Sequence, residues 1–198
     1  MTYKNRHLSI LLIAAFGACT RSTVQQLPSP SPTSPARALP PAASGAATPG
    51  GSTASATLHD ASGKTVGTVT FTDTYTGILI VGTAADLGLG AHGIHVHEIG
   101  KCEAPFASAG GHFNPEHRQH GFRNPNGPHL GDLPNLDTPA SGQLRFEFLL
   151  PGVTLRGSNA VLDGDGAAIV IHAGRDDYAA DPSGNSGGRV ACGVITAR

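Results

Sequence analysis

The chain has 198 residues, with 13 basic and 14 acidic side chains, 27 glycines, 15 prolines, 10 histidines and 3 cysteines. This length fits one domain with a real core and is barely enough for two. The near-neutral charge, without a basic run, excludes the electrostatic footprint of a nucleic-acid partner. Low aromatic and charged content with abundant glycine argues against a helical bundle and favours an all-β chain with many turns.

The first residues predict export. Lys4 and Arg6 precede an apolar run, residues 8–16, that is too short to stay as a membrane span, so residues 1–18 are predicted to be a signal peptide. The small residues before Cys19 resemble a bacterial lipobox, in which the cysteine carries lipid and begins the mature chain. The alternative is ordinary cleavage nearby, with Cys19 discarded. Either way we expect an exported chain of the cell envelope or periplasm.

Residues 19–55 are predicted to be a disordered tether. They are almost entirely Ser, Thr, Pro, Ala, Gly and Gln, and include 7 of the 15 prolines. Too few apolar side chains are present to offset the entropy of ordering. With lipid on Cys19, this segment would hold a single folded domain, residues 56–198, off a membrane that the chain contacts through its N-terminal lipid only.

The folded part reads as a series of short strands. In residues 144–150, Leu144, Phe146 and Phe148 alternate with Arg145 and Glu147, which predicts a strand with one apolar face. Residues 68–72 alternate in the same way. Further strands are expected at residues 56–60, 77–83, 93–98, 159–162, 167–172 and 189–196. About eight short strands without a helical period predict an antiparallel sandwich or barrel.

A segment of about forty residues, 104–142, breaks this pattern. It is rich in Gly, Pro, Asn and His, and a loop that long inside a compact domain has a function or is held by something other than packing. Beside it, His95 and His97 are two apart on a predicted strand, so both point to one face with Cα atoms roughly 6.6 Å apart. His172 ends another predicted strand. Imidazole suits copper and zinc, which indicates a metal site.

The motifs resemble those of the copper/zinc superoxide dismutases. Residues 93–100, GIHVHEIG, resemble the first family signature, and residues 184–195, GNSGGRVACGVI, resemble the second. Between them, His112, His120, His129 and Asp132 match the zinc loop in type and in spacing, at 8, 9 and 3 positions. The resemblance covers residues 56–198 and implies an eight-stranded Greek-key sandwich or barrel, immunoglobulin-like, with a long metal-binding loop.

This resemblance implies a role for each matched residue. One copper ion per subunit is expected on His95, His97, His112 and His172, and one zinc ion on His112, His120, His129 and Asp132. His112 would bridge both metals and take part in catalysis, Asp176 would orient one ligand of each metal from outside the ligand shell, and Arg189 would receive the anionic substrate. Cys102 and Cys192 would form a disulfide, leaving Cys19 for lipid; two buried free thiols are the alternative. His59, His92 and His117 match no ligand, and we interpret them as structural or solvated.

The implied reaction is dismutation of superoxide to oxygen and hydrogen peroxide, which would protect the cell against exogenous oxidative stress. A departure concerns residues 173–188, a short loop with one cation, Arg175, against Asp176, Asp177 and Asp181, so strong electrostatic steering is not expected. Two alternatives share the fold: an envelope lipoprotein that holds copper and zinc without turnover, and an adhesion module. The subunit is expected to be a monomer or a homodimer.

Overall fold

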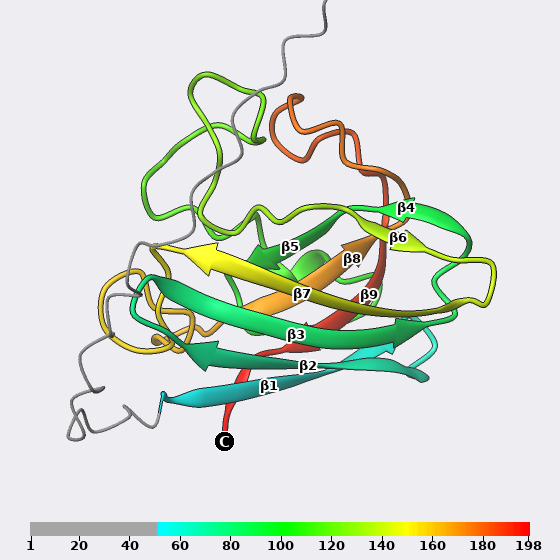
Figure 1. Cartoon of the computed structure of the whole chain (residues 1–198), viewed down its shortest axis with the longest axis horizontal. Helices are drawn as coiled ribbons and strands as arrows, with labels where there is room; N and C mark the ends of the chain where they lie inside the picture. The colour runs from blue at the N-terminus through cyan, green and yellow to red at the C-terminus, as the bar shows by residue number, and fades with distance from the viewer. Residues whose placement is uncertain (1–50) are drawn as a thin grey trace, which may run out of the picture. The chain divides into compact units, whose positions relative to one another are not determined.

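A computed structural model describes residues 51–198, and these form a curled antiparallel sheet and a separate pair of short strands (Figure 1). The strands are β1 (Thr53–Asp60), β2 (Thr65–Asp73), β3 (Gly77–Ala85), β4 (Gly90–His92), β5 (Ile94–His97), β6 (Leu136–Thr138), β7 (Gln143–Pro151), β8 (Ala168–His172), β9 (Arg189–Val194) and β10 (Thr196–Ala197). Within residues 51–198 one 3-10 turn, η1, covers Ala107–Ala109. The predicted all-β fold is confirmed.

The main sheet has eight strands in the order β5-β8-β9-β1-β2-β3-β7, with β10 paired to β1. Strands β7 and β3 are neighbours although three strands separate them in sequence, so the chain crosses between the halves of the sheet. The sheet curls into a half-barrel, with β5, β8 and β9 behind β3 and β7 in Figure 1. The short strands β4 and β6 form a separate pair. None of the helical structure in residues 51–198 is long and apolar enough to cross a membrane.

Alternating side chains build the core between the two halves. On β7, Leu144, Phe146 and Leu150 are buried while Arg145 and Glu147 are exposed, as the sequence pattern predicts. The largest fully buried side chains of this main core come from strands of both halves of the sheet and from two loop residues, Leu133 and Leu155. The strand residues are Leu58, Phe71, Ile78, Ile80, Ile94, Leu150, Ile169 and Ile171. Burial of this apolar surface is the main contribution to stability.

Strands β5 and β8 are buried on both faces. Ile94 and Val96 of β5 pack in the main core, so the alternating His95 and His97 lie on the opposite face. On β8, Ile169 and Ile171 pack in the main core, while Ala168 and Val170 pack in a second cluster with Phe106, Ala109 and Cys192. The long loop after β5 therefore covers the outer face of these strands and encloses the histidines.

Three details of the predicted elements are wrong. Residues 159–162 form only an isolated bridge between Thr154 and Ala160, in a loop whose Val161 is buried in the main core. The segment 104–142 contains η1 and β6, and β6 pairs with the unpredicted β4. Strand β1 begins at Thr53, before the expected start at residue 56. The signal peptide, Cys19 and most of the predicted tether lie outside the described residues.

The predicted disulfide is confirmed. Cys102 and Cys192 are joined, with Cα atoms 5.7 Å apart and a sequence separation of 90. Cys192 is fully buried on β9 beside Phe106 and Ala109, and Cys102 packs against the same cluster. The bridge fastens the start of the long loop to the sheet that it covers.

Removing this bridge tests its role. We expect Cys102→Ser together with Cys192→Ser to lower the free energy of unfolding of the metal-free protein by about 3 to 5 kcal/mol, because a long loop of the unfolded chain is no longer closed. Urea unfolding measures the change, and wild type unfolded with a reducing agent is the matched control. A double variant as stable as oxidised wild type would show that packing alone holds the loop.

Candidate metal centre

The outer edge of β5 positions the loop that carries the remaining histidines. The Val96 N–H donates to Gly131 O at 2.9 Å, and the Phe113 N–H donates to Val96 O at 2.8 Å. These bonds create isolated bridges that pair His97 with His112 and His95 with Asp132. The loop thus runs beside β5 as an extra edge, and it brings residues distant in sequence next to the two strand histidines.

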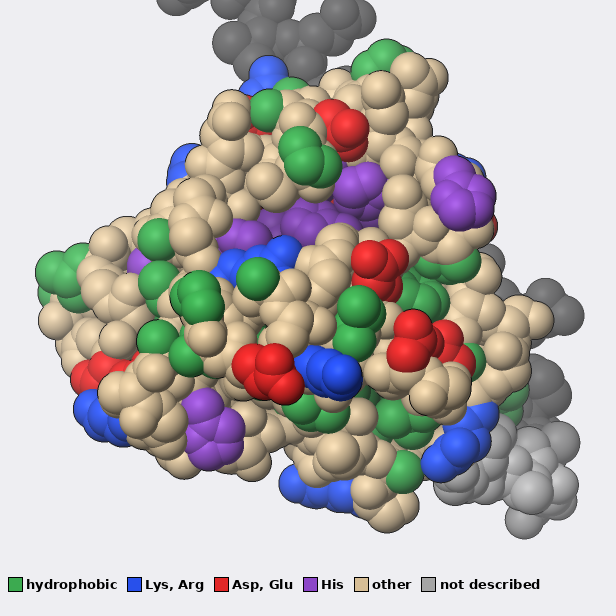
Figure 2. All heavy atoms as spheres, turned by 180° about the vertical axis from the view of Figure 1, so that it is seen from behind, with side chains coloured by type: hydrophobic (Ala, Val, Ile, Leu, Met, Phe, Trp, Pro, Cys, Tyr) green, Lys and Arg blue, Asp and Glu red, His purple; other side chains and the backbone are tan. Residues whose placement is uncertain are grey.

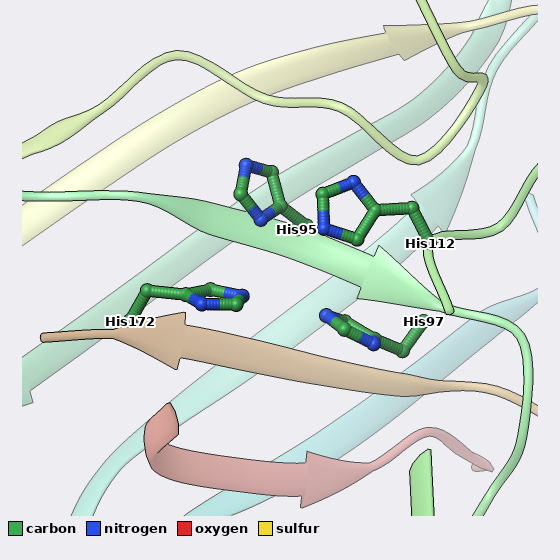
Figure 3. Close-up of side chains that lie close together, drawn as sticks. All are labelled: His95, His97, His112 and His172. Carbon is green, nitrogen blue, oxygen red and sulfur yellow. The ribbon is translucent and has the colours of Figure 1, made fainter. Parts of the chain in front are cut away.

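Four imidazoles point at one another across this edge (Figure 3). His95 and His97 come from β5, His172 from the end of β8, and His112 from the loop. Each offers one nitrogen, and these four atoms all lie within 4.8 Å of one another. The family resemblance predicted that these four histidines form one site, and the structure brings them together.

The hydrogen bonds of these imidazoles leave one nitrogen of each without a partner. Nε2 of His95 lies 2.8 Å from Oδ2 of Asp176, and Nδ1 of His97 lies 3.0 Å from Gly110 O. Nδ1 of His112 lies 2.9 Å from Oδ1 of Asp132, and Nδ1 of His172 lies 3.2 Å from Gly187 O. In these four rings the buried atoms that lack a partner are His95 Nδ1, His97 Nε2, His112 Nε2 and His172 Nε2. In His95, His97 and His172 an acceptor fixes the proton on the other ring nitrogen, so the lone pair of the unpartnered nitrogen faces the common point. In His112 the unpartnered Nε2 faces the same point, and Nδ1 faces the donors around Asp132.

Burial keeps this group of imidazoles neutral. Desolvation lowers the pKa of His97 to about 2, with the neighbouring His112 and Arg189 adding to the effect. Desolvation also lowers the pKa of His112 to about 4 and that of His172 to about 3. The pKa of His95 is lowered in the same way. Neutral imidazoles are the form that binds a metal, so four ready donors fit a copper ion.

A second set of donors surrounds Oδ1 of Asp132. This oxygen lies 2.9 Å from His112 Nδ1, 3.0 Å from His120 Nδ1 and 3.3 Å from His129 Nδ1. Tetrahedral zinc with ligands at about 2.0–2.1 Å has ligand atoms about 3.3 Å apart. The other oxygen, Oδ2, accepts the N–H groups of Gly121 at 2.9 Å and His129 at 3.0 Å, which orients the carboxylate. Three imidazoles and one carboxylate therefore fit zinc.

His95 and His129 compete for the fourth place in this second set. His95, His112, His120 and Asp132 also have donor atoms within 4.8 Å of one another. However, Nε2 of His95 is bonded to Asp176, and its Nδ1 faces the first set. His129 Nδ1, by contrast, lies 3.3 Å from His112 Nδ1 as well as 3.3 Å from Asp132. We therefore assign His129 to zinc and His95 to copper.

The buried carboxylate of Asp176 connects the two sets. Its Oδ2 lies 2.8 Å from His95 Nε2, and both oxygens lie 3.0 Å from His120 Nε2. Burial by itself raises the pKa of Asp176, but the hydrogen bonds to His120 and His95 outweigh it and hold this pKa well below its usual range. Burial by itself lowers the pKa of His120, but its hydrogen bonds to Asp132 and Asp176 raise it to about 9. Asp176 is thus an anion that orients one imidazole of each set.

Arg189, at the start of β9, lies on the wall of a cavity above these imidazoles. The cavity has a volume of about 500 Å³ and is lined by Glu98, Gly111, His112, Asn114, His117, His129, His172, Pro182, Ser183, Gly187 and Arg189. Figure 2 shows histidines in a hollow with a basic side chain beside them. The guanidinium donates to Phe106 O at 2.5 Å and to Gly110 O at 2.6 Å, and Gly110 O also accepts from His97. Arg189 is thereby fixed relative to the copper set.

The acids of the short loop do not line this cavity. Asp177 accepts the N–H groups of Ala179 and Ala180, both at 2.8 Å, and Asp181 accepts that of His120 at 2.6 Å. Among the described residues on the cavity wall, the carboxylate is Glu98 instead. The sequence did not identify Glu98 or His117 as cavity residues, because a polar residue after a strand and a loop histidine carry no distinctive signal.

These donor sets define the class of protein, a β half-barrel in which a copper site and a zinc site share one imidazole. A family model described as copper/zinc superoxide dismutase (SODC) matches residues 65–195. The chain is 46% identical over 137 residues to Cu-Zn superoxide dismutase 1 of Aquifex aeolicus (strain VF5), covering 67% of this chain and 81% of that one. It is 45% identical over 146 residues to Cu-Zn superoxide dismutase 2 of the same organism, covering 72% and 85%.

Solved structures give the same result. The crystal structure of a SOD-like protein from Bacillus subtilis is similar with a TM-score of 0.68 and 41% identity, covering 71% of this chain and 96% of that one. The chain belongs to the copper/zinc superoxide dismutase family. It is an oxidoreductase whose residues fit one copper and one zinc ion.

Gly184 offers a direct test of the Asp176 contact. Its φ is +62°, and a Cβ there would overlap Oδ1 of Asp176 and lie 2.7 Å from His120 Nε2. We expect Gly184→Ala to displace the carboxylate and weaken zinc binding by about 10- to 100-fold, the usual effect of losing a partner that orients a ligand. Competition with a chromophoric chelator measures the affinity.

The matched control is Gly188→Ala. A Cβ at Gly188 would meet nothing within 4 Å. This variant should bind zinc as wild type does. Equal affinities for the two variants would contradict the view that Asp176 holds His120 in position for zinc.

Proposed function

We propose that this chain dismutates superoxide to oxygen and hydrogen peroxide in the cell envelope, anchored by lipid, and protects the cell against exogenous superoxide. One observation carries the enzymatic part of the proposal. Four buried imidazole nitrogens without a hydrogen-bond partner converge beneath a cavity whose wall carries Arg189. With copper bound, these nitrogens would hold a one-electron redox centre beneath a cavity lined by His112, His172 and Arg189.

The bound metals supply the redox chemistry, because copper exchanges single electrons whereas zinc has one stable oxidation state. We assign proton transfer to His112: its Nδ1 would stay with the zinc donors beside Asp132, and its Nε2 would hold a proton for the reduced substrate only when that atom does not bind copper. Asp132 keeps the His112 ring in place during this transfer. The chain therefore positions a proton donor beside the site of reduction.

We assign substrate binding to Arg189. Its guanidinium is half-buried, and its two hydrogen bonds to backbone carbonyls hold it at a fixed place on the cavity wall. Burial lowers the pKa of Arg189, but a guanidinium remains cationic at any physiological pH. A fixed positive charge in a partly enclosed cavity stabilises a bound anion more than a free side chain in water does.

The envelope location rests on sequence and chemistry. The basic and apolar residues before Cys19 support export, and the Cys102–Cys192 disulfide suits an oxidising compartment. We infer that residues 1–18 are removed, that Cys19 carries the lipid, and that the tether after it links the lipid to the folded domain, whose first strand begins at Thr53. In this location the enzyme would meet superoxide that arrives from outside the cell.

A second candidate function is storage of copper and zinc without turnover. It requires the same six histidines and Asp132, but neither a fixed cation nor an open path to the copper donors. Arg189 and the cavity of about 500 Å³ therefore favour the enzyme. An adhesion module would need none of these ligands.

Superoxide decay followed by pulse radiolysis tests the enzymatic proposal. With copper and zinc loaded, we expect His97→Ala to lower the rate constant at least about 100-fold, because one copper donor is lost. We expect Arg189→Ala to lower it about 10-fold and Arg189→Lys to recover part of the loss, because charge is partly restored. His59→Gln, outside the cavity, should match wild type. A wild type no faster than free copper would support metal storage instead.

Mass spectrometry of the membrane fraction tests the anchor. In a bacterial host with lipoprotein processing we expect a mature chain that starts at Cys19 and carries diacylglycerol, because the preceding residues resemble a lipobox. Cys19→Ser should move the protein to the soluble fraction while leaving its dismutase activity unchanged. An unmodified N-terminus elsewhere in the wild type would exclude the lipid anchor.

A further inference from the structure

His117 lies on the wall of the copper cavity, although it matches no metal ligand. Its side chain is exposed, and it shares the cavity with Arg189 and Glu98. It also lines an adjoining hollow of about 360 Å³. His117 is thus the solvent-exposed one of the two cavity residues, whereas Arg189 is half-buried.

The backbone holds His117 in a fixed and unusual conformation. Its φ is +53°, in the left-handed region that costs a side-chain-bearing residue energy. Asn114 fixes this turn: its backbone O accepts the His117 N–H at 3.1 Å, and its side-chain amide makes two bonds of 2.9 Å with the backbone of Arg118. The imidazole therefore projects from a braced turn.

The charged residues near His117 are mostly acidic, so they offer few favourable contacts to an anion at this side of the cavity. Glu98 shares both hollows with it, Asp163 and Asp165 line the adjoining one, and Arg189 is the cation of the copper cavity. On its own turn, Glu116 and Arg118 form a pair at 2.8 Å. These carboxylates repel superoxide. A hydrogen-bond donor at position 117 therefore offsets this repulsion where the anion first meets it.

We propose that His117 is a guiding residue for superoxide, donating an imidazole N–H to the entering anion before Arg189 receives it. This inference rests on the proposed dismutase function. His117 determines how readily an anion reaches the copper, and it takes no part in the redox step. The chain thereby compensates in part for a short loop without cations that face the cavity.

Charge substitution at His117 tests the proposal on protein that carries one copper and one zinc per chain. At low ionic strength we expect His117→Lys to raise the rate constant for superoxide about two-fold and His117→Glu to lower it by at least as much, with His117→Gln slightly below wild type. The differences should shrink as salt increases, because screening weakens charge steering. Azide is an anion that binds without being turned over. Its affinity, read from the copper absorption band, should rank the variants in the same order as the rate constant does.

Tyr75→Lys and Tyr75→Glu are the matched controls. Tyr75 is 89% exposed and lines neither hollow, so these variants change net charge alone. If both positions change the rate constant and azide affinity equally, or if the His117 variants change neither, His117 is only a solvated loop residue. An inactive wild type would instead contradict the dismutase function, and azide binding would still show whether His117 recognises anions.

Discussion

The metal centre depends on one buried anion, Asp176. Its carboxylate is 1% exposed and lies within hydrogen-bond distance of His95, from the copper set, and His120, from the zinc set. An uncompensated carboxylate in such a place would cost several kcal/mol, so the two imidazoles stabilise the anion as much as the anion orients them. Asn135 donates to Asp176 O at 2.9 Å and accepts from Asp176 N–H at 2.8 Å, which fixes the backbone that carries this carboxylate. The strand-borne and loop-borne donors are thereby held as one unit.

The curled sheet makes this unit possible because β5 and β8 each present a second buried face. Apolar residues on the inner face fill the main core, and histidines on the outer face are enclosed by the long loop. The Cys102–Cys192 bridge and the bonds along β5 keep the loop in contact with the sheet. Enclosure then excludes water, which keeps the copper imidazoles neutral and leaves their lone pairs available.

The sequence was sufficient to predict the ligands and most of the strands. Spacing of two residues on a strand puts His95 and His97 on one face, and the family motifs account for His112, His120, His129 and Asp132. Short strands such as β4 and β6 were not predicted, because three residues show no period and their pairing depends on distant segments. Contacts between segments far apart in the chain also decide which side chains line the cavity. They turn Asp177 and Asp181 away from it and place Glu98 and His117 on its wall. No local pattern encodes such contacts.

The central claim is that two different metals occupy two neighbouring sites that share His112. Anomalous diffraction at the copper and zinc absorption edges, from crystals of the copper- and zinc-loaded protein, tests it most directly. We expect one copper peak bounded by His95 Nδ1, His97 Nε2, His112 Nε2 and His172 Nε2, and one zinc peak bounded by Nδ1 of His112, His120 and His129 with Asp132 Oδ1. A single peak, or a zinc ion bound by His95 in place of His129, would contradict the claim.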